Sequence, residues 1–439
     1  MIQASKNERY AMTERLDIKS LPAMSEYGFT GGRDNFRAFC RKVFAAPEPR
    51  FLRTPDNNLV VFRNADLIRF GTAPEIGNLP IGRMYPDSFR EGAGPERPPG
   101  WEIGEVISSQ IFTFNPPLHG PARRMILNWL GPKQVGQMAE LARDVARTVV
   151  GRMRDGETID LVESVAEAVV VGFWSRLLYL TDEEAMVIGR CAQDMTRLFH
   201  ANRSQEDLRI LDRAFAEYAR LLHLASLRGL ERGDPAMLEI AAKLKELDIT
   251  DDPYEVGLVP KSVGAVLAGN LIDGFHTAAL AAANTLHVLF HNPDALAAVR
   301  RSPETLPRAI AEALRLEPPV LALNRYALRD FHFDGLVLPA GSKVMMMWAA
   351  GNHDPSVFPE PERFDISRPQ PGLTTFGSGI HICPGRHAGV MLTRVMLEEF
   401  FAQEVEIGNA EKPAEWIPDH FMSQLRVFPA SISRLDKGD

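Results

Sequence analysis

Apolar residues between positions 132 and 316 recur at the three- and four-residue spacing that is typical of amphipathic helices. Turn-forming residues interrupt this pattern at 155–156, 233–235 and 251–253. Residues 262–291 contain no such break, and at 1.5 Å per residue they would form one helix of about 45 Å. Pro293 follows this segment. We therefore expect a mainly helical region with a long central helix.

The pattern changes after Pro318 and Pro319. Short β-like segments at 336–338 and 344–348 are separated by turn residues. The predicted fold class is mainly α with small β-sheets (α+β), in which one large helical domain with a minor β-rich region covers residues 1–439. Three further segments are predicted to be mobile. Residues 1–30 are expected to form a mobile arm, whereas residues 85–117 and 198–235 are candidates for mobile loops or helices that control access.

Charge and cysteine content exclude several classes of protein. Lys and Arg number 49 against 57 Asp and Glu, a formal charge of −8, so the basic excess that phosphate binding requires is lacking. The three cysteines are scattered, which argues against a disulfide framework and favours a reducing cytoplasm. The first 24 residues lack the hydrophobic region of a signal or anchor. Residues 274–290 are apolar but include polar groups that lipid would leave unpaired, so a buried helix is expected rather than a membrane span.

Residues 376–385 surround Cys383 with glycines and precede a periodic helix. At the start of a helix, free N–H groups favour a thiolate and lower its pKa, which makes the cysteine a nucleophile or a metal ligand. Such a thiolate can be the axial ligand of haem iron. A zinc site built from His381, Cys383 and His387 is the alternative, but no fourth ligand lies nearby in the sequence.

The segment reads Phe-x-x-Gly-x-x-x-Cys-x-Gly with His381 two residues before the cysteine, and it resembles the haem-binding loop of the cytochrome P-450 family. The resemblance implies that fold, haem b as cofactor and Cys383 as the metal ligand. It also assigns Phe376, Gly377, His381 and Gly385 to cofactor binding. His119, Arg123 and Arg325 resemble the other residues of the family that contact the haem propionates.

A Glu-x-x-Arg motif at Glu312 and Arg315 precedes the β-like region. Alone it would indicate only a helical surface pair. In the family a glutamate and an arginine at this place join a downstream arginine in a buried network behind the haem loop. The resemblance implies that Arg363 is this third member, and that the network is structural.

Within the long predicted helix, residues 273–277 resemble the family pattern Ala/Gly-Gly-x-Asp/Glu-Thr. Gly274 would let the helix open locally, and the Thr277 hydroxyl would relay protons to dioxygen. His276 replaces the usual acid, so it either relays protons, assists cleavage of hydrogen peroxide, or points away and makes a core hydrogen bond. Asp273 replaces a small residue and could bind a substrate hydroxyl or amine.

The predicted function is a haem-thiolate monooxygenase that uses dioxygen to oxidise a mostly apolar small organic substrate. Since 439 residues leave no fused redox domain, ferredoxin and ferredoxin reductase are the expected electron donors. Residues 320–323 and 421–422 are expected near the substrate. A peroxide-using peroxygenase or an isomerase is the main alternative, and a haem-binding sensor without enzymatic activity is the other. Neither nucleic acid nor a membrane is an expected partner.

Overall fold

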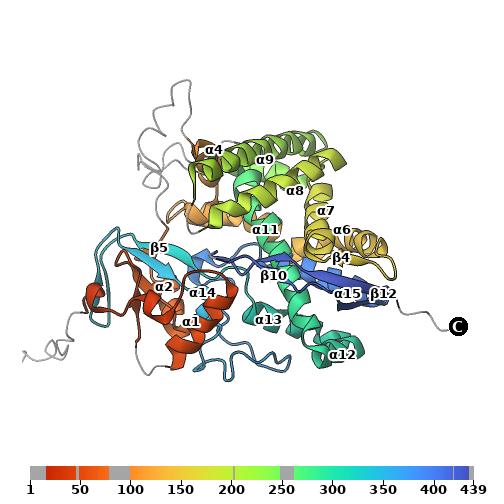
Figure 1. Cartoon of the computed structure of the whole chain (residues 1–439). Coiled ribbons are helices and arrows are strands. Elements are labelled where there is room, and N and C mark those ends of the chain that lie inside the picture. Colours follow the sequence, from red (N-terminus) through yellow and green to blue (C-terminus); the bar gives the residue numbers. More distant parts are fainter. Residues whose placement is uncertain are drawn as a thin grey trace, which may run out of the picture.

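The computed structural model describes residues 16–45, 49–78, 99–200, 203–247, 262–418 and 420–434. Helices dominate this part of the chain (Figure 1). The helices are α1 (Arg33–Ala45), α2 (Asn64–Thr72), α4 (Trp101–Ile107), α5 (His119–Leu130), α6 (Pro132–Gly151), α7 (Ala168–Leu177), α8 (Asp182–Met195), α9 (Gln205–Glu231), α10 (Pro235–Glu246), α11 (Val263–Phe290), α12 (Pro293–Arg301), α13 (Leu306–Leu316), α14 (Trp348–Gly351) and α15 (Arg386–Ala402). Shorter helical turns are η1 (Ile18–Ser20), η2 (Met24–Tyr27), η4 (Ile111–Thr113), η5 (Val162–Glu167), η6 (Thr196–Phe199), η7 (Pro303–Thr305) and η8 (Gly379–His381).

The strands form four small sheets. The largest has five strands in the order β1-β2-β8-β5-β3, and within it only β2 and β8 run parallel. A three-stranded sheet, β4-β12-β9, and the pairs β10-β11 and β6-β7 complete the set. The strands are β1 (Leu52–Arg53), β2 (Leu59–Val61), β3 (Ile76–Gly77), β4 (Thr158–Asp160), β5 (Leu323–Ala327), β6 (Phe331–Phe333), β7 (Leu336–Leu338), β8 (Lys343–Met346), β9 (Val405–Asn409), β10 (Glu415–Trp416), β11 (Leu425–Val427) and β12 (Pro429–Arg434). The predicted class, mainly α with small sheets, is confirmed.

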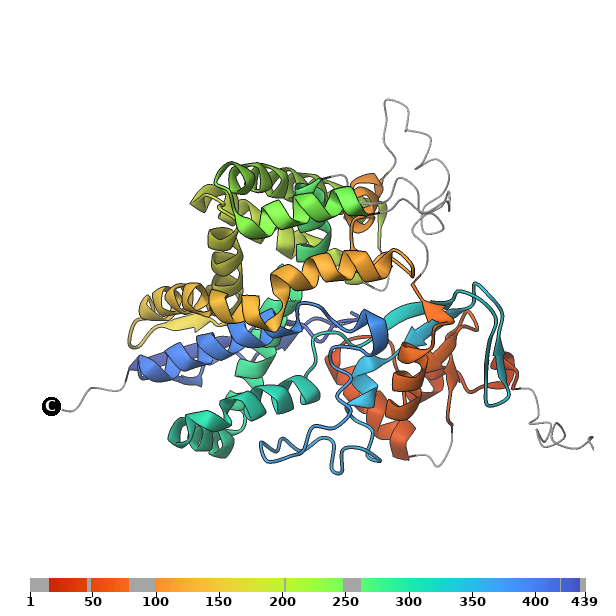
Figure 2. The same ribbon diagram turned by 180° about the vertical axis from the view of Figure 1, so that it is seen from behind.

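Helix α11 is the long central helix that the sequence predicts. It spans 28 residues, and the predicted bounds are right to within one residue at each end. The Ser262 hydroxyl oxygen accepts a hydrogen bond from the Ala265 N–H at 3.1 Å and so caps the first turn. The helix passes between the α-helical part and the β-rich part of the protein (Figures 1 and 2). Its length and composition would suit a membrane span, but 67% of its most apolar window is buried, as in the core helix of a globular protein.

The central helix belongs to the larger of two kinds of apolar core. Side chains of α5 to α9, α11 and α15 form one large apolar cluster. Two smaller clusters lie between the five-stranded sheet and the helices α1 and α2. Both β-like segments of the sequence form strands, β7 and β8, although Trp348 at the end of the second one begins the short helix α14 instead.

One of the segments predicted to be a mobile loop or helix contains a long helix, and part of the predicted arm is packed. Residues 205 to 231 form the 27-residue helix α9, which Ser204 caps by accepting from the Asp207 N–H at 3.0 Å. In the predicted N-terminal arm, residues 16 to 30 are packed, with Leu21, Met24 and Phe29 buried. Residues 1–15 and 85–98 lie outside the described residues, so what is predicted for them remains a prediction. The prediction of a single domain also remains a prediction.

Candidate active site

The glycine-rich segment around Cys383 forms a tight loop before helix α15. The Cys383 N–H donates to the Phe376 carbonyl oxygen at 2.9 Å, and the Gly377 N–H donates to the Thr374 carbonyl oxygen at 2.9 Å. Gly377 has a φ of +74° and Gly379 a φ of +71°, values that favour glycine. These two bonds fold the loop so that Cys383 lies three residues before α15, which begins at Arg386.

Backbone contact with helix α2 holds the loop in place. A Cβ atom on Gly379 would lie 1.9 Å from the carbonyl oxygen of Gly71, a distance that no side chain can occupy. A Cβ on Gly71 would in turn meet the Ser378 hydroxyl at 2.8 Å. Glycine at both positions therefore lets the loop and the helix meet directly.

The pKa of the Cys383 thiol differs from the sequence-based expectation. Burial raises this pKa and outweighs the Gly385 backbone N–H and the cations of Arg386 and Arg123, which lower it. The predicted lowering by the helix start is therefore wrong for the protein alone, because desolvation opposes the charged form more strongly than the local dipoles favour it. The carboxylate of Asp273 on α11 also raises the thiol pKa, so the two groups interact electrostatically across the space between α11 and the loop.

Glu312 is the centre of a buried network behind the loop. Its side chain is fully buried and accepts hydrogen bonds from Arg315 Nε at 2.8 Å and Nη2 at 2.9 Å. Arg315 also donates to the Asn352 carbonyl oxygen at 2.9 Å. The Asn352 side chain in turn donates to the Thr375 hydroxyl at 2.9 Å, next to Phe376. The network therefore connects α13 with the segment that leads into the cysteine loop.

The third member of this network is Arg368, and the prediction of Arg363 is wrong. Arg368 Nε donates to Glu312 Oε1 at 3.0 Å, whereas the Arg363 guanidinium is 62% exposed and pairs with Glu360 and Asp365. Only the backbone carbonyl of Arg363 takes part, as an acceptor for Arg315 at 3.3 Å. The chain turns after Phe364, and this turn directs Arg368 inward and Arg363 toward solvent.

Four groups able to carry a positive charge gather from separate segments beside the loop: His119 and Arg123 of α5, Arg325 of β5 and His381 of η8. The rings of His119 and His381 lie 4.3 Å apart. Burial and the charges of Arg325, His119 and Arg123 lower the pKa of His381 to about 3. Burial and Arg123 lower the pKa of His119 to about 4, and burial lowers that of Arg325 to about 10.

This cluster has no anionic partner in the described part of the chain. No carboxylate of those residues lies within ion-pair distance, 4.0 Å, of Arg123 or Arg325. His381 Nε2 is buried without a hydrogen-bond partner. At pH 7 the two imidazoles are neutral, and Arg123 and Arg325 carry the positive charge. Since buried cations require compensation, the cluster has the character of a binding site for a negatively charged group.

The site residues predicted on α11 lie within residues 273–277, and their side chains point in different directions. The Thr277 hydroxyl donates to the Asp273 carbonyl oxygen one turn back, and Trp174 Nε1 donates to the Gly274 carbonyl oxygen at 3.3 Å. A Cβ on Gly274 would meet its neighbours at 3.6 Å, an ordinary contact, so this glycine is not required sterically in the structure. The helix is continuous through these positions.

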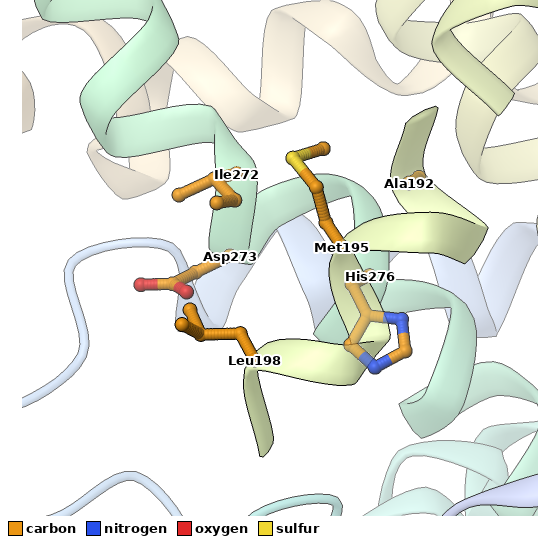
Figure 3. Close-up of a pocket in the computed structure, with 6 residues that line it drawn as sticks. All are labelled: Ala192, Met195, Leu198, Ile272, Asp273 and His276. Atoms are coloured by element: carbon orange, nitrogen blue, oxygen red, sulfur yellow. The ribbon is translucent and has the colours of Figure 1, made fainter. Parts of the chain in front are cut away.

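His276 and Asp273 line a small pocket between α11, α8 and η6, together with Ala192, Met195, Leu198 and Ile272 (Figure 3). Burial and the charge of His420 lower the pKa of His276 to about 4, although a hydrogen bond with the Gln424 side chain opposes this shift. His276 is therefore neutral at pH 7. The Asp273 carboxylate points away from the imidazole and past Leu198 (Figure 3).

Several contacts of the site could not be found from the sequence. Asn78 Nδ2 lies 3.3 Å from His381 Nδ1, Gln110 Nε2 donates to Asp273 Oδ2 at 3.4 Å, and Gln424 contacts His276. Each is an isolated polar residue in an ordinary context, and none lies in a motif. Arg368 could have been considered as the network arginine, because it lies just after the Pro361 to Phe364 segment.

The comparisons agree with this geometry. The family model for cytochrome P-450 matches residues 301–406. A C-19 steroid 1alpha-hydroxylase of Sorangium cellulosum is 30% identical over 310 residues, 68% of this chain and 74% of the relative. The chain belongs to the cytochrome P-450 family. A 6-deoxyerythronolide B hydroxylase of Saccharopolyspora erythraea is 26% identical over 303 residues, 69% of this chain and 72% of the relative.

Solved structures show the same fold. A myxobacterial cytochrome P-450 in complex with myristic acid has a TM-score of 0.75 at 19% identity, with 94% of this chain and all of that chain covered. The haem domain of a Tepidiphilus thermophilus P-450 has a TM-score of 0.74 at 20% identity and covers 96% of this chain and 97% of that one. The protein is thus an oxidoreductase with the cytochrome P-450 fold, and its cofactor is haem b.

The residues present fit this cofactor. Haem carries two propionates, and the cluster of His119, Arg123, Arg325 and His381 lacks the anions that it would bind. One member of the cluster, His381, lies on the same loop as Cys383, a soft thiol of the kind that ligates haem iron.

Proposed function

We propose that this cytochrome P-450 is a monooxygenase that inserts one atom of dioxygen into a mostly apolar small organic substrate. The observation that carries the proposal is the position of Cys383: its thiol interacts electrostatically with Asp273 of α11 and lies beside the unpaired cation cluster. The overall reaction consumes the substrate, dioxygen, two electrons and two protons, and it releases the hydroxylated product and water. Related hydroxylases among the relatives support this reaction class.

Cys383 is the proposed iron ligand, and Phe376, Gly377 and Gly385 shape the loop that presents it. His119, Arg123, Arg325 and His381 are proposed to bind the two propionates by charge and hydrogen bonds. Thiolate-ligated haem supplies the activation of dioxygen and the cleavage of its O–O bond. The protein's own contribution is to hold the ligand, to exclude water and to supply protons.

We assign the proton delivery to Thr277, with His276 as its neighbour on α11. The Thr277 hydroxyl can pass a proton without changing charge, since it both donates and accepts. His276 is neutral at pH 7, so it can accept a hydrogen bond and return a proton from the same ring. Gly274, next to them on α11, packs against Leu271 and Trp174, whose nearest atoms would lie 3.6 Å from an added Cβ.

Electrons are proposed to come from a ferredoxin and its reductase in the cytoplasm. Arg386 donates to the Cys383 carbonyl oxygen at 2.9 Å and so lies on the cysteine side of the site, and Arg124, exposed on α5, is proposed as a second docking cation. An acidic ferredoxin would be attracted to that side despite the net charge of −8. A steep fall of the electron-transfer rate with ionic strength is the expected result, and a flat dependence contradicts this docking side.

The direct test is the Cys383→Ser variant, with Cys40→Ser and Cys191→Ser as matched controls. Both control cysteines are buried away from the loop. The two controls should keep the absorption spectrum of a ferrous carbon monoxide complex with a thiolate ligand, and Cys383→Ser should lose it. Retention of that spectrum in Cys383→Ser contradicts the proposal.

A peroxide-using enzyme is the second candidate, because His276 stands in place of the usual acid and a neutral imidazole can assist cleavage of hydrogen peroxide. Turnover with reductase, ferredoxin and dioxygen identifies the monooxygenase. Turnover with hydrogen peroxide alone, at a rate that equals or exceeds the reductase-driven rate, identifies the peroxygenase.

A further inference from the structure

Asp273 places a carboxylate inside the protein without a cation to balance it. Its only described hydrogen bond comes from the neutral amide of Gln110, at 3.4 Å. No arginine or lysine nitrogen of the described residues lies within 4.0 Å of it. Asp273 is exposed to solvent, but the surrounding protein atoms raise the pKa of its carboxyl, so we infer that it faces a water-accessible space within the protein.

The surroundings of this carboxylate are apolar or neutral. Ile272, Met195, Leu198 and Ala192 line the pocket at its side, and Figure 3 shows the carboxylate beside Leu198. His276 is neutral at pH 7, so it supplies no opposite charge. The charges that act on Cys383 include Asp273, which places the carboxylate on the side of α11 that faces the cysteine loop.

An ionised carboxylate in such surroundings is costly unless a cation or several hydrogen bonds accompany it. Other buried carboxylates have a cation or several hydrogen bonds. Glu312 pairs with Arg315 and Arg368, and Glu317 pairs with Arg33 and Arg37. Asp354 accepts hydrogen bonds from the Asn64 N–H, the Ser356 N–H and the Ser356 hydroxyl. Asp273 differs from these carboxylates, because the described residues supply it with no cation and with only one hydrogen bond. Its side chain faces the space where a substrate would lie.

We propose that the substrate is an apolar molecule with a cationic nitrogen, and that Asp273 binds this nitrogen. The inference rests on the proposed function, since it assumes that the space between α11 and the cysteine loop holds both cofactor and substrate. The aliphatic lining would take the hydrocarbon part of the substrate, and the carboxylate would supply the one strong polar contact that fixes its orientation. A neutral molecule of the same shape would leave Asp273 unpaired and would bind more weakly.

The test compares two molecules of equal shape and different charge. One is (2-phenylethyl)trimethylammonium, and the other is its neutral isostere 3,3-dimethylbutylbenzene. The quaternary nitrogen has no lone pair and cannot ligate iron, so a spin-state change reports occupation of the pocket. Homologous pairs with one methylene fewer and one methylene more cover small differences in pocket length. Calorimetry measures the same binding without reference to the haem spectrum.

The variants are Asp273→Asn, Asp273→Glu and the control Asp194→Asn. Asp194 of α8 is 51% exposed and pairs weakly with Arg197, so its replacement removes the same charge from the outer surface. We expect the wild type and Asp194→Asn to bind the cation at least tenfold more tightly than its isostere. Asp273→Asn should reduce this preference to within about twofold, and Asp273→Glu should retain most of it.

Several outcomes overturn the inference: equal affinities in the wild type, no binding of either member of any pair, or an unchanged preference in Asp273→Asn. Tighter binding of the neutral members would also overturn it, because a negatively charged Asp273 would favour the cation. The ferrous carbon monoxide spectrum of each variant separates this result from a failure of the proposed function. Loss of thiolate character in the wild type contradicts the haem-thiolate assignment, whereas its presence with no charge preference contradicts only the inference about the substrate.

Discussion

Arg368 Nε donates a hydrogen bond to Glu312 Oε1 at 3.0 Å, although 56 positions separate the two residues. The contact ties the segment after Phe364 to α13, directly behind the cysteine loop. Glu312 Oε1 also accepts from the Asp365 N–H at 3.1 Å, and Glu312 Oε2 accepts from Gln370 Nε2 at 2.6 Å. One buried carboxylate thus organises a long stretch of irregular backbone.

Replacing Arg368 should therefore cost much more than replacing Arg363. In Arg368→Met the Glu312 carboxylate keeps its charge but loses one cation, so we expect the free energy of unfolding to fall by about 3–5 kcal/mol. Arg363→Met removes an exposed side chain and should change it by less than about 0.5 kcal/mol. Urea unfolding and haem content per polypeptide measure both effects, and equal losses in the two variants would contradict the network as described.

Gly379 should tolerate no side chain, for a reason beyond its backbone angle. Gly341 has a φ of +86° with nothing within 4 Å of an added Cβ, so Gly341→Ala isolates the cost of the angle, about 1–2 kcal/mol. Gly379→Ala has a similar angle and adds the clash with the Gly71 carbonyl oxygen. We expect its loss of stability to exceed that of Gly341→Ala by about 1–3 kcal/mol, and we expect it to lose haem. Thermal unfolding measures the stability, and the absorption spectrum measures the haem content. Comparable melting temperatures and haem contents would show that the loop can move away from α2.

Arg325→Leu should stabilise the haem-free protein and weaken the binding of haem. Burial lowers the pKa of Arg325 to about 10, so its charge is unfavourable in the haem-free protein. Removing it should stabilise that form against urea. Haem should then leave about 10–100-fold faster in transfer to a scavenging apoprotein, because charge-assisted hydrogen bonds worth about 1.5–3 kcal/mol are lost. Arg329→Leu is the control, since Arg329 is 65% exposed and pairs with Glu75. If Arg325→Leu lowers the resistance of the haem-free protein to urea and also weakens haem retention, the side chain has a packing role instead.

Asp273→Asn should stabilise the protein above pH 6. Burial raises the pKa of Asp273 from 3.8 to about 6. The folded state therefore holds this proton more tightly than the unfolded state does. The resulting contribution to stability is complete below about pH 4 and is lost as the pH rises through 6. At 1.36 kcal/mol per pKa unit the full penalty would approach roughly 3 kcal/mol, but water in the cavity screens the charge, so we expect a gain of about 1 kcal/mol.

Urea unfolding at pH 7.5 and pH 4 measures this gain, which should be present at the first pH and absent at the second. Tyr218 and Cys383 are the other titratable groups that interact with Asp273, and the pKa values of both are raised, so neither ionises in this range. His276, one turn away on α11, is neutral above its pKa of about 4. A gain of equal size at both pH values would mean that Asp273 is destabilising for a reason other than its charge.

The local features of this protein could be predicted from the sequence because they depend on neighbouring residues. The central helix was correct to one residue at each end, since Ser262 caps its start and Pro293 follows its end. The cysteine loop could be recognised because its two glycines with positive φ and its cysteine lie within ten residues of one another. The cluster of His119, Arg123, Arg325 and His381 was predicted by family resemblance alone, and its convergence in the structure depends on three elements far apart in the chain.

Tertiary structure decided the features that depend on burial and on long-range direction. Arg363 and Arg368 both follow Pro361 within a few residues, and only the turn after Phe364 determines which guanidinium reaches Glu312. The sign of the Cys383 pKa shift required the balance between desolvation and nearby charges, which no local motif contains. The sequence alone determines which groups can bind haem and which residues shape the loop. The packing of α11 determines which groups surround Asp273 and leaves its carboxylate without a cation among the described residues. The reason is that the distance between segments far apart in the chain depends on the whole fold.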